Sequence, residues 1–388
     1  MPLRRAAHVM LEPRERIEFD LGDLVAGGDG LGSQLEWIAI LPHAAREIPV
    51  TADDAVALGA ISPSRWTPRD ALESAHSPHV IEALLGHGLL VEKGSHADRR
   101  DGVVREAGWR TASAGLHYGS RWRGVDTAEV QRNFNELHGG DLMSQLGPAP
   151  PHVRERADVR DRIALSRAPS SPLEALLDAR VTCRNFDAAP LREADFAAVL
   201  QRAFSARAVD DYAPGLKLLK KGVPSAGGLH PTEAYLLVQR VEGVAPGLYH
   251  YHPVDHALEP MRALGADEAR ALATSFVGAQ PYFIDAPALV TPTARFGRNF
   301  WKYRNHPKAY RALVLDVGHL SQTIYLAATE LGLAAFITAA INEIDIEEAF
   351  GLDPLEEGPL AVCGFGLRAA RRTAFEFDPL HAVWPAAG

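Results

Sequence analysis

Two short segments of the sequence hold side chains whose types and spacing suit proton and anion chemistry. Lys302 and Tyr303 are adjacent, and burial or a neighbouring cation can bring the pKa of either residue toward neutrality, as general acid–base catalysis requires. Arg180, Thr182 and Arg184 alternate, so an extended segment would place two guanidinium groups and a hydroxyl on one side, where they could bind a phosphate. The alternative interpretation of the Lys-Tyr segment is aromatic packing with solvated charges. The alternative for the arginine segment is a surface turn with solvated arginines.

A glycine-rich loop lies between these two segments in the sequence. Glycine permits positive φ, and it also lets a flat ligand lie against bare backbone, so the loop is either a turn or a close-approach site. Near the C-terminus, Arg368, Arg371 and Arg372 follow a predicted buried strand and supply further cations. The loop consists of Pro224, Ser225, Ala226, Gly227 and Gly228.

Other site chemistries receive less support from the sequence. His250 and His252 share one face of a predicted strand, but we favour a polar strand face over a metal site because no carboxylate or thiol joins them at ligand spacing. The chain contains neither a Gly-x-Gly-x-x-Gly motif that follows a strand and opens a helix nor a Gly-x-Ser-x-Gly motif. We therefore expect no metal, no dinucleotide-binding motif of the Rossmann type and no α/β-hydrolase triad.

Composition narrows the protein class. The chain has 388 residues, 47% of them hydrophobic and 23% charged, which predicts globular domains with substantial cores. A net charge of -9 argues against a nucleic-acid partner. Two cysteines suit a reducing cytoplasm, and the most apolar segment, 331–341, is well short of the roughly twenty residues of a membrane-spanning helix. Without a signal-peptide pattern at the start, we expect a soluble, cytoplasmic protein with no membrane partner.

The elements that must position these residues fall into two predicted domains. A proline-rich stretch at 147–151, followed by charged residues, predicts a first domain at 1–150, a linker at 151–169 and a second domain at 170–388. Short helices starting at 67–68 and at 77–78, the second closed by Gly86, and a strand at 88–91 predict a winged-helix-like first domain. Packing or peptide binding is favoured over DNA binding, because no helix there is rich in arginine and lysine.

The second domain is predicted to be α+β. Helical spacing predicts a long helix over 312–331, ended by Gly332, with Val314, Val317 and Ile324 on its apolar face. Its many alanines permit close approach of another helix. Further helices are predicted over 174–177 and 192–204, and strands over 234–241, 247–252, 286–290, 334–340 and 360–366.

Taken together, these segments resemble the FMN-dependent nitroreductase-like superfamily, and in particular its SagB-type branch, the dehydrogenases of azole-containing peptide maturation. The resemblance covers roughly residues 170–370. It rests on Arg180-x-Thr-x-Arg184-x-Phe186, Pro224-Ser-Ala-Gly-Gly-Leu-His-Pro231 with Tyr235, Gly247-Leu-Tyr-His-Tyr251, Lys302-Tyr303, Gly318-His319-x-x-Gln322 and Gly364-x-Gly366.

The resemblance implies a nitroreductase-like fold and a set of FMN-binding residues. The loop at 224–228 would lie along the flavin, while Arg180, Thr182 and Arg184 would bind the phosphate together with Arg368 or one of the arginines at 371 and 372. A backbone N–H in the segment Thr338, Ala339 and Ala340 would contact flavin N5. In that branch a Lys-Tyr pair is catalytic, and here it corresponds to Lys302 and Tyr303.

The same resemblance implies a reaction and partners. We expect oxidation of azolines to azoles in a modified precursor peptide, by a homodimer with the flavin at the subunit interface, in association with a cyclodehydratase. One alternative is an NAD(P)H-dependent reductase of nitro, quinone or dehydroamino-acid substrates on the same fold. The other is a non-catalytic, peptide-binding scaffold subunit.

Overall fold

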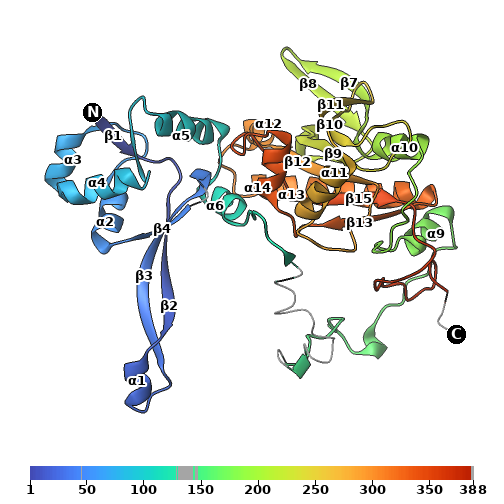
Figure 1. Cartoon of the computed structure of the whole chain (residues 1–388), viewed down its shortest axis with the longest axis horizontal. Helices are drawn as coiled ribbons and strands as arrows, with labels where there is room; N and C mark the ends of the chain where they lie inside the picture. The colour runs from blue at the N-terminus through green and yellow to red at the C-terminus, as the bar shows by residue number, and fades with distance from the viewer. Residues whose placement is uncertain (45, 128, 130–142, 145–146, 386–388) are drawn as a thin grey trace.

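The computed structural model describes residues 1–44, 46–127, 129, 143–144 and 147–385 (Figure 1). We call residues 1–92 the N-terminal part and residues 172–366 the body. In Figure 1 the N-terminal part and the body lie at opposite ends of the long axis, with helices α5 (His96–Ala107) and α6 (Thr111–Gly119) leading from one to the other.

The compact region of the N-terminal part consists of three helices and a three-stranded antiparallel sheet. Strand β1 (Pro2–Arg5) lies between β5 (Thr67–Pro68) and β6 (Leu90–Glu92). The helices are α2 (Ala52–Ala60), α3 (Arg69–His76) and α4 (Pro78–Gly86). Ser77 caps α4 by accepting a hydrogen bond from the Val80 N–H, and Pro78 occupies its first turn, so the predicted start of this helix is confirmed. The helix predicted to begin at 67–68 begins instead at Arg69, because Thr67 and Pro68 pair with β1.

A long antiparallel ribbon extends from the N-terminal part (Figure 1). Strand β2 (Met10–Phe19) pairs with β3 (Leu31–Leu41), which also pairs with β4 (Arg46–Val50), and the turn at the far end carries α1 (Leu21–Val25). The 3-10 turn η1 (Pro42–Ala44) links β3 to β4. Large apolar side chains such as Phe19 and Leu35 are exposed on the ribbon. The resemblance of the N-terminal part to a winged helix stays a prediction.

The body is a seven-stranded antiparallel sheet covered by helices on both faces, which confirms the predicted α+β class. The strand order is β11-β10-β9-β12-β15-β13, with β14 paired to β12. The strands are β9 (Thr232–Val238), β10 (Gly247–His252), β11 (Ala257–Ala263), β12 (Ala288–Arg295), β13 (Ala334–Thr338), β14 (Glu357–Pro359) and β15 (Val362–Gly366). A separate hairpin of β7 (Ala206–Ala213) and β8 (Leu216–Lys221) projects from the body (Figure 1).

The two faces of the sheet bury two distinct cores. Successive side chains of a strand point to opposite faces, and in β9 Leu236 joins one core whereas Leu237 joins the other. Helices α10 (Glu193–Phe204) and α13 (Ala309–Glu330) cover the first face, and α11 (Ala266–Phe276) and α14 (Glu343–Phe350) cover the second. Helix α9 (Pro172–Ala179) precedes this layer, and α12 (Phe296–Tyr303) leads into α13. The sequence patterns predicted α10 and α13 but missed α11, α12 and α14.

Helix α13 buries most of the apolar face that the sequence predicted, with Val314 as the exception. It begins at Ala309, three residues earlier than expected, and ends at Glu330, two residues before Gly332. Leu313, Leu320 and Ile324 are buried, whereas Val314 is 52% exposed, so its predicted place on the apolar face was wrong. Val317 and Ile324, the other two residues named for that face, are buried as predicted, whereas Val314 lines a cavity instead of the sheet.

Residues 96–127 pack against the body although they precede the proline-rich stretch. Trp109 is buried among aromatic side chains, with ring centroids 4.7 Å from Phe296 and 4.5 Å from Phe300. Arg100 forms an ion pair with Asp353, 2.5 Å between nitrogen and oxygen. These contacts attach α5 and α6 to the body, while the predicted domain bounds stay a prediction.

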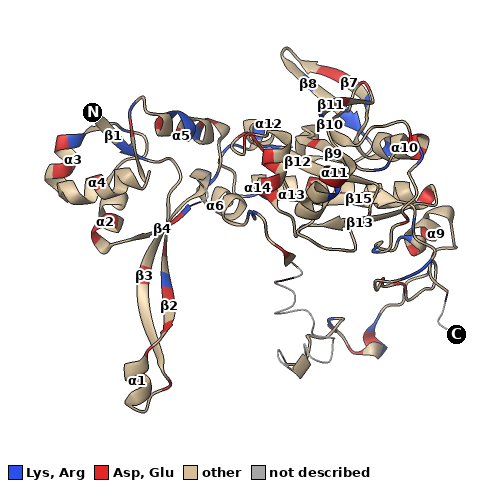
Figure 2. Cartoon of the chain, in the orientation of Figure 1, with Lys and Arg blue, Asp and Glu red and all other residues tan. Residues whose placement is uncertain are grey.

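The segment predicted as a linker has little regular structure. Residues 151–169 are exposed and contain one 3-10 turn, η2 (Val159–Asp161). Lysines, arginines and acidic residues are interspersed over the N-terminal part and the body (Figure 2). Within the described residues, no helix is both long and apolar enough to cross a bilayer.

Packing of the sheet predicts an effect of Gly364→Ala. A methyl group there would overlap the Phe336 ring and lie 3.0 Å from Leu289, so we expect a loss of about 1 to 3 kcal/mol in the free energy of unfolding. Gly102→Ala is the matched control, because a methyl group in that helical position meets no atom within 4 Å and should change stability by at most about 1 kcal/mol in the favourable direction. Urea denaturation measures both, and equal stabilities would contradict the packing argument.

Candidate functional site

The adjacent Lys302 and Tyr303 lie against the glycine-rich loop. They occupy the last turn of α12, and the loop forms the 3-10 turn η3 (Ala226–Gly228). A Cβ atom on Gly227 would lie 2.6 Å from Lys302 Nζ and 2.6 Å from the Tyr303 hydroxyl. The Lys302 ammonium is also 5.6 Å from the centroid of the Tyr303 ring. Two segments 75 residues apart in the sequence therefore meet, and the missing side chain of Gly227 makes room for both polar groups.

Asp316 on α13 fixes the conformation of this loop. The Ser225 hydroxyl donates to Asp316 Oδ2 at 2.5 Å, and the Ala226 N–H donates to Oδ1 at 3.2 Å. The His230 N–H in turn donates to Ser225 Oγ at 3.0 Å. Asp316 is buried, and burial raises the pKa of its carboxyl group. Sequence reasoning missed this residue, because a single aspartate on a helix face carries no signal until the fold brings the loop to it.

Arg180 and Thr182 share one partner, Tyr325 on α13. The Thr182 and Tyr325 hydroxyls are 2.9 Å apart, and the Arg180 guanidinium lies 5.3 Å from the Tyr325 ring centroid. Thr182 also bridges to Ala335 of β13, which aligns residues 180–186 with the edge of the sheet. The expected extended segment with alternating side chains is therefore present.

Arg184 and Arg368 come together around a buried carboxylate that sequence reasoning did not identify. Glu376 accepts hydrogen bonds from the Arg184 N–H at 2.5 Å and from the Trp384 indole N–H at 2.7 Å, and it pairs with the Arg368 guanidinium. The Arg184 guanidinium itself lies 5.4 Å from the ring of Tyr282. Arg368 is thus already neutralised within the chain.

The other two arginines near the C-terminus are less closely placed. Arg371 and Arg372 are exposed, and the guanidinium of Arg372 lies 6.0 Å from the Trp384 ring centroid. Neither forms an ion pair with a described acidic residue.

The segment expected to contact the flavin follows β13. Thr338 is buried, and its hydroxyl accepts a hydrogen bond from the Gln280 amide at 3.0 Å. The same hydroxyl accepts from the Ala340 N–H at 3.2 Å, so Ala340 donates within its own loop. Ala339 is exposed and contributes to the lining of a cavity of about 230 Å3.

The predicted site residues form two groups on different sides of α13. Consecutive residues of a helix are about 100° apart around its axis, so Asp316 and Tyr325 point in different directions, and an exposed stripe separates them. Arg180 and Thr182 lie at Tyr325, whereas the loop with Lys302 and Tyr303 lies at Asp316. Within the described residues, no hydrogen bond or ion pair joins the two groups. The stripe consists of Arg311, Val314, Leu315, Gly318, His319 and Gln322.

The strand histidines have carboxylate neighbours that sequence spacing did not anticipate. His250 Nδ1 is 2.6 Å from Glu259, and His250 Nε2 is 3.4 Å from Glu233, because β11 and β9 pair with β10 on either side. The hydrogen bond to Glu233 is the main cause of a raised pKa for His250. His252 contacts Asp255 instead, at 3.0 Å. The sequence spacing therefore did not reveal that two carboxylates lie beside His250.

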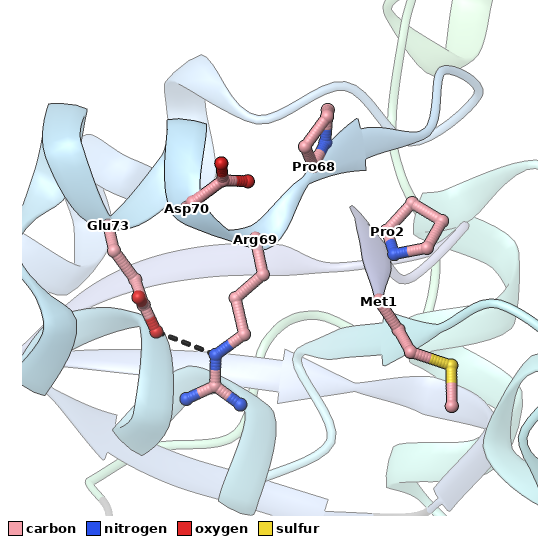
Figure 3. Close-up of a pocket in the computed structure, with 6 residues that line it drawn as sticks. All are labelled: Met1, Pro2, Pro68, Arg69, Asp70 and Glu73. Atoms are coloured by element: carbon pink, nitrogen blue, oxygen red, sulfur yellow. Dashed lines mark hydrogen bonds and ion pairs between the residues drawn. The ribbon is translucent and has the colours of Figure 1, made fainter.

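A hollow of about 500 Å3 on the N-terminal part contains none of the predicted site residues (Figure 3). Arg69 and Glu73 of α3 form an ion pair across one wall at 2.6 Å, and the chain start forms the other side. Its polar groups are paired or face solvent. The residues predicted to bind FMN and to transfer protons all lie outside this hollow. The lining residues are Met1, Pro2, Pro68, Arg69, Asp70 and Glu73.

Comparison with known proteins gives one family match and several relatives. Residues 177–367 match the model of the Nitroreductase family. The chain is 31% identical to "Putative nitroreductase MJ1384" of Methanocaldococcus jannaschii over 194 residues, which is 50% of this chain and 90% of that protein.

Two further relatives are named as peptide-processing proteins. The chain is 32% identical to the trifolitoxin-processing protein TfxB of Rhizobium leguminosarum bv. trifolii, over 39% of this chain and 41% of the relative. It is 29% identical to the microcin B17-processing protein McbC of Escherichia coli, over 38% of this chain and 54% of the relative. Both matches span less than two thirds of the relative.

The contact between the loop and the Lys-Tyr pair predicts different effects of alanine at two adjacent glycines. Gly227 and Gly228 have φ of 62° and 70°, so alanine at either position should cost about 1 to 2 kcal/mol of stability. Only at Gly227 would the methyl group meet Lys302 and Tyr303, since nothing lies within 4 Å at Gly228. We expect the NMR signals of carbon-13-labelled Tyr303, assigned with Tyr303→Phe, to shift in Gly227→Ala and to stay in place in Gly228→Ala. Equal shifts in both variants would contradict the contact.

Proposed function

The chain belongs to the nitroreductase family, and we propose that it is an FMN-dependent oxidoreductase that oxidises azoline rings to azoles during maturation of a ribosomally made peptide. The observation that carries this proposal is the meeting of Lys302 and Tyr303 with the Gly227 backbone. That meeting combines a candidate proton-transfer pair with a stretch of bare backbone on which a flat ring can lie.

The names of two relatives support the choice of a peptide substrate. TfxB and McbC are named as processing proteins of trifolitoxin and microcin B17. The family match at residues 177–367 covers the part of the chain that holds the Lys-Tyr pair. We therefore propose a modified precursor peptide as the substrate and a cyclodehydratase, which makes the azoline, as an associated enzyme.

The residues of the body fit the chemistry of FMN. Arg180 and Thr182 offer a cation and a hydroxyl beside Tyr325, and Arg184 adds a second cation, so these three would hold the phosphate. Arg368 would contribute less, because Glu376 already pairs with it. Nothing lies within 4 Å of a Cβ position at Gly228, so the backbone there leaves room that suits an isoalloxazine ring, next to the Lys-Tyr pair that fills the space at Gly227. When bound, FMN would accept a hydride from the substrate.

Lys302 and Tyr303 would move the second hydrogen. Conversion of an azoline to an azole removes a hydride and a proton from adjacent ring atoms, so a base must accept the proton as the hydride leaves. The Lys302 ammonium and the Tyr303 hydroxyl both lie at Gly227 and are close enough for one to orient or polarise the other. We assign the proton transfer to this pair as a unit.

A second copy of the chain would complete the site. The phosphate-binding group and the loop group lie on different sides of α13, separated by the exposed stripe. Val314 and Leu315 in this stripe are 52% and 57% exposed, and Gly318 lies next to them, so a second copy could bury apolar surface and approach closely. We propose a twofold homodimer in which each site takes one group from each copy.

Two alternatives remain distinct in their tests. The match to MJ1384 over 90% of that protein favours, as a second candidate, an NAD(P)H-dependent reductase of nitro, quinone or dehydroamino-acid substrates. Rapid bleaching of bound flavin by NAD(P)H alone would support it, whereas bleaching by cyclised peptide alone would support azoline oxidation. A protein that cannot be reconstituted with FMN would instead be a scaffold subunit.

We further propose that the N-terminal part binds peptide and that the protein works in the cytoplasm.

The proposed phosphate site predicts how arginine variants discriminate two flavins. Arg180→Ala should weaken FMN binding about 10- to 100-fold, because a charge-assisted hydrogen bond contributes about 1.5 to 3 kcal/mol. Binding of riboflavin, which has no phosphate, should stay unchanged. Arg65→Ala is the control, because that exposed arginine lies in the N-terminal part and not among the proposed phosphate-binding residues. Fluorescence titration measures both flavins, and an equal loss for FMN and riboflavin would contradict the phosphate assignment.

The Lys-Tyr pair predicts a loss of turnover without a loss of cofactor. Lys302→Ala and Tyr303→Phe should each lower the rate of peptide-dependent flavin reduction at least 100-fold, since general acid–base catalysis contributes about 10²- to 10⁴-fold. Retained FMN absorbance shows that the site is intact. Lys308→Ala, in the turn after the pair, is the control and should keep the wild-type rate. Stopped-flow absorbance measures reduction, and full activity in both variants would rule out the proton-transfer role.

A further inference from the structure

The cavity beside Ala339 contains a carboxyl group that the proposed function does not yet use. The cavity measures about 230 Å3. At about 30 Å3 for each water in the liquid, it has room for roughly seven water-sized groups, more than a five-membered ring needs. Its walls come from α6, the first turns of α13, the start of α14 and the end of β14. The lining residues are His117, Ser120, Trp122, Tyr310, Val314, Val317, Ala339, Glu343, Pro359 and Leu360.

Glu343 is the acidic residue of this lining. Its Oε2 accepts a hydrogen bond from the Trp122 N–H at 2.8 Å. Desolvation is the main cause that raises the pKa of Glu343 to about 7. Near neutral pH the carboxyl group is therefore protonated in a large fraction of molecules and can donate a hydrogen bond into an otherwise mostly apolar cavity.

The charged and titratable groups around Glu343 have other partners. Arg121 forms a buried ion pair with Glu347 at 2.8 Å, and Arg123 pairs with Glu348 at 2.5 Å. His117 is buried, its Nδ1 lies 3.0 Å from the Tyr310 hydroxyl, and burial lowers its pKa to about 3, so it is neutral. Asp345 accepts from the Ser275 hydroxyl at 2.6 Å. Within the described residues, none of these groups forms an ion pair with Glu343.

Residues 120–127 hold this wall in place through a series of contacts with the acidic α14 (Figure 2). The Ile344 N–H donates to the Trp122 carbonyl at 3.1 Å, which completes a pair of backbone contacts around Glu343. The Gly124 N–H donates to Asp345 at 3.1 Å, and the Val125 N–H donates to Asn342 at 2.8 Å. The cavity is thus a built feature, with one wall supplied by residues far from the body in sequence.

We propose that this cavity binds the heterocycle of the peptide substrate and that protonated Glu343 donates a hydrogen bond to the ring nitrogen. This inference rests on the proposed function and on the flavin contact that the family resemblance implies for the segment with Ala339. An azoline nitrogen is a hydrogen-bond acceptor, and a donor to it draws electrons from the C=N bond. The adjacent C–H becomes more acidic, so a base such as the Lys-Tyr pair would remove its proton more easily. Glu343 itself keeps its proton.

Ligand binding tests this inference without requiring turnover. The purified full chain with FMN is titrated with 2-methylthiazole, a neutral ring with an acceptor nitrogen, and binding is followed by ligand-observed NMR. A carboxyl group with a pKa of about 7 is protonated about tenfold less at pH 8 than at pH 6, so the wild-type affinity should fall about tenfold over this range. Competition with cyclised peptide identifies the probe site as the substrate site.

Two variants distinguish a hydrogen-bond donor role of Glu343 from a role as a base or a purely structural role. Glu343→Gln keeps an N–H donor at all pH values, so its affinity should not change between pH 6 and pH 8, and peptide-dependent flavin reduction should persist. Glu343→Ala should bind weakly at both pH values. Glu356→Gln, at an exposed glutamate outside the cavity lining, is the control and should behave as wild type.

The opposite results would overturn the inference. These are no probe binding to the wild type, pH-independent binding, or a Glu343→Gln variant as inactive as Glu343→Ala while it retains FMN. If the probe binds with the expected pH dependence but cyclised peptide reduces no flavin, azoline oxidation is wrong and the donor site stands. If cyclised peptide reduces the flavin but the Glu343 variants bind the probe with the wild-type affinity, the proposed function stands and this inference fails.

Discussion

The packing of α13 against the sheet is the constraint on which the rest of the site depends. Burial of Leu313, Leu320 and Ile324 fixes the rotation of this helix about its axis. That rotation directs Asp316 toward the glycine-rich loop and Tyr325 toward Arg180 and Thr182. It also leaves Val314 and Leu315 exposed. One packed helix thereby determines where the loop lies, where the arginines lie, and which surface stays uncovered.

The chemistry of the site is divided among segments that have little in common in sequence. The body supplies the arginines, the glycine-rich loop and the Lys-Tyr pair, whereas residues 117–122 supply a wall of the cavity at Glu343. Carboxyl groups that are partly or fully buried recur in these arrangements. Asp316 anchors the loop, Glu376 neutralises Arg368, and Glu343 faces the cavity. Each is held by defined donors, which is how a protein fixes buried carboxyl groups without leaving them unsatisfied.

The segment between the N-terminal part and the body packs against the body. Aromatic packing around Trp109 and the contacts of residues 120–127 with α14 attach the chain before the proline-rich stretch to the body. A substrate cavity with walls from both sides of that stretch would respond to changes in either. This arrangement suits a long, flexible substrate such as a peptide, because surfaces that are distant in sequence can contact different parts of it.

The sequence by itself determined the α+β class, the extended arginine segment, α10, α13 and the positions of the glycine-rich loop and the Lys-Tyr pair, because local periodicity and residue type carry that information. Only the tertiary structure decided that Gly227 meets Lys302 and Tyr303, that Asp316 and Glu376 matter, and that His250 lies between two glutamates. It also placed Val314 on the exposed side of α13. These features depend on helix rotation, strand order and contacts between distant residues, which no local pattern encodes.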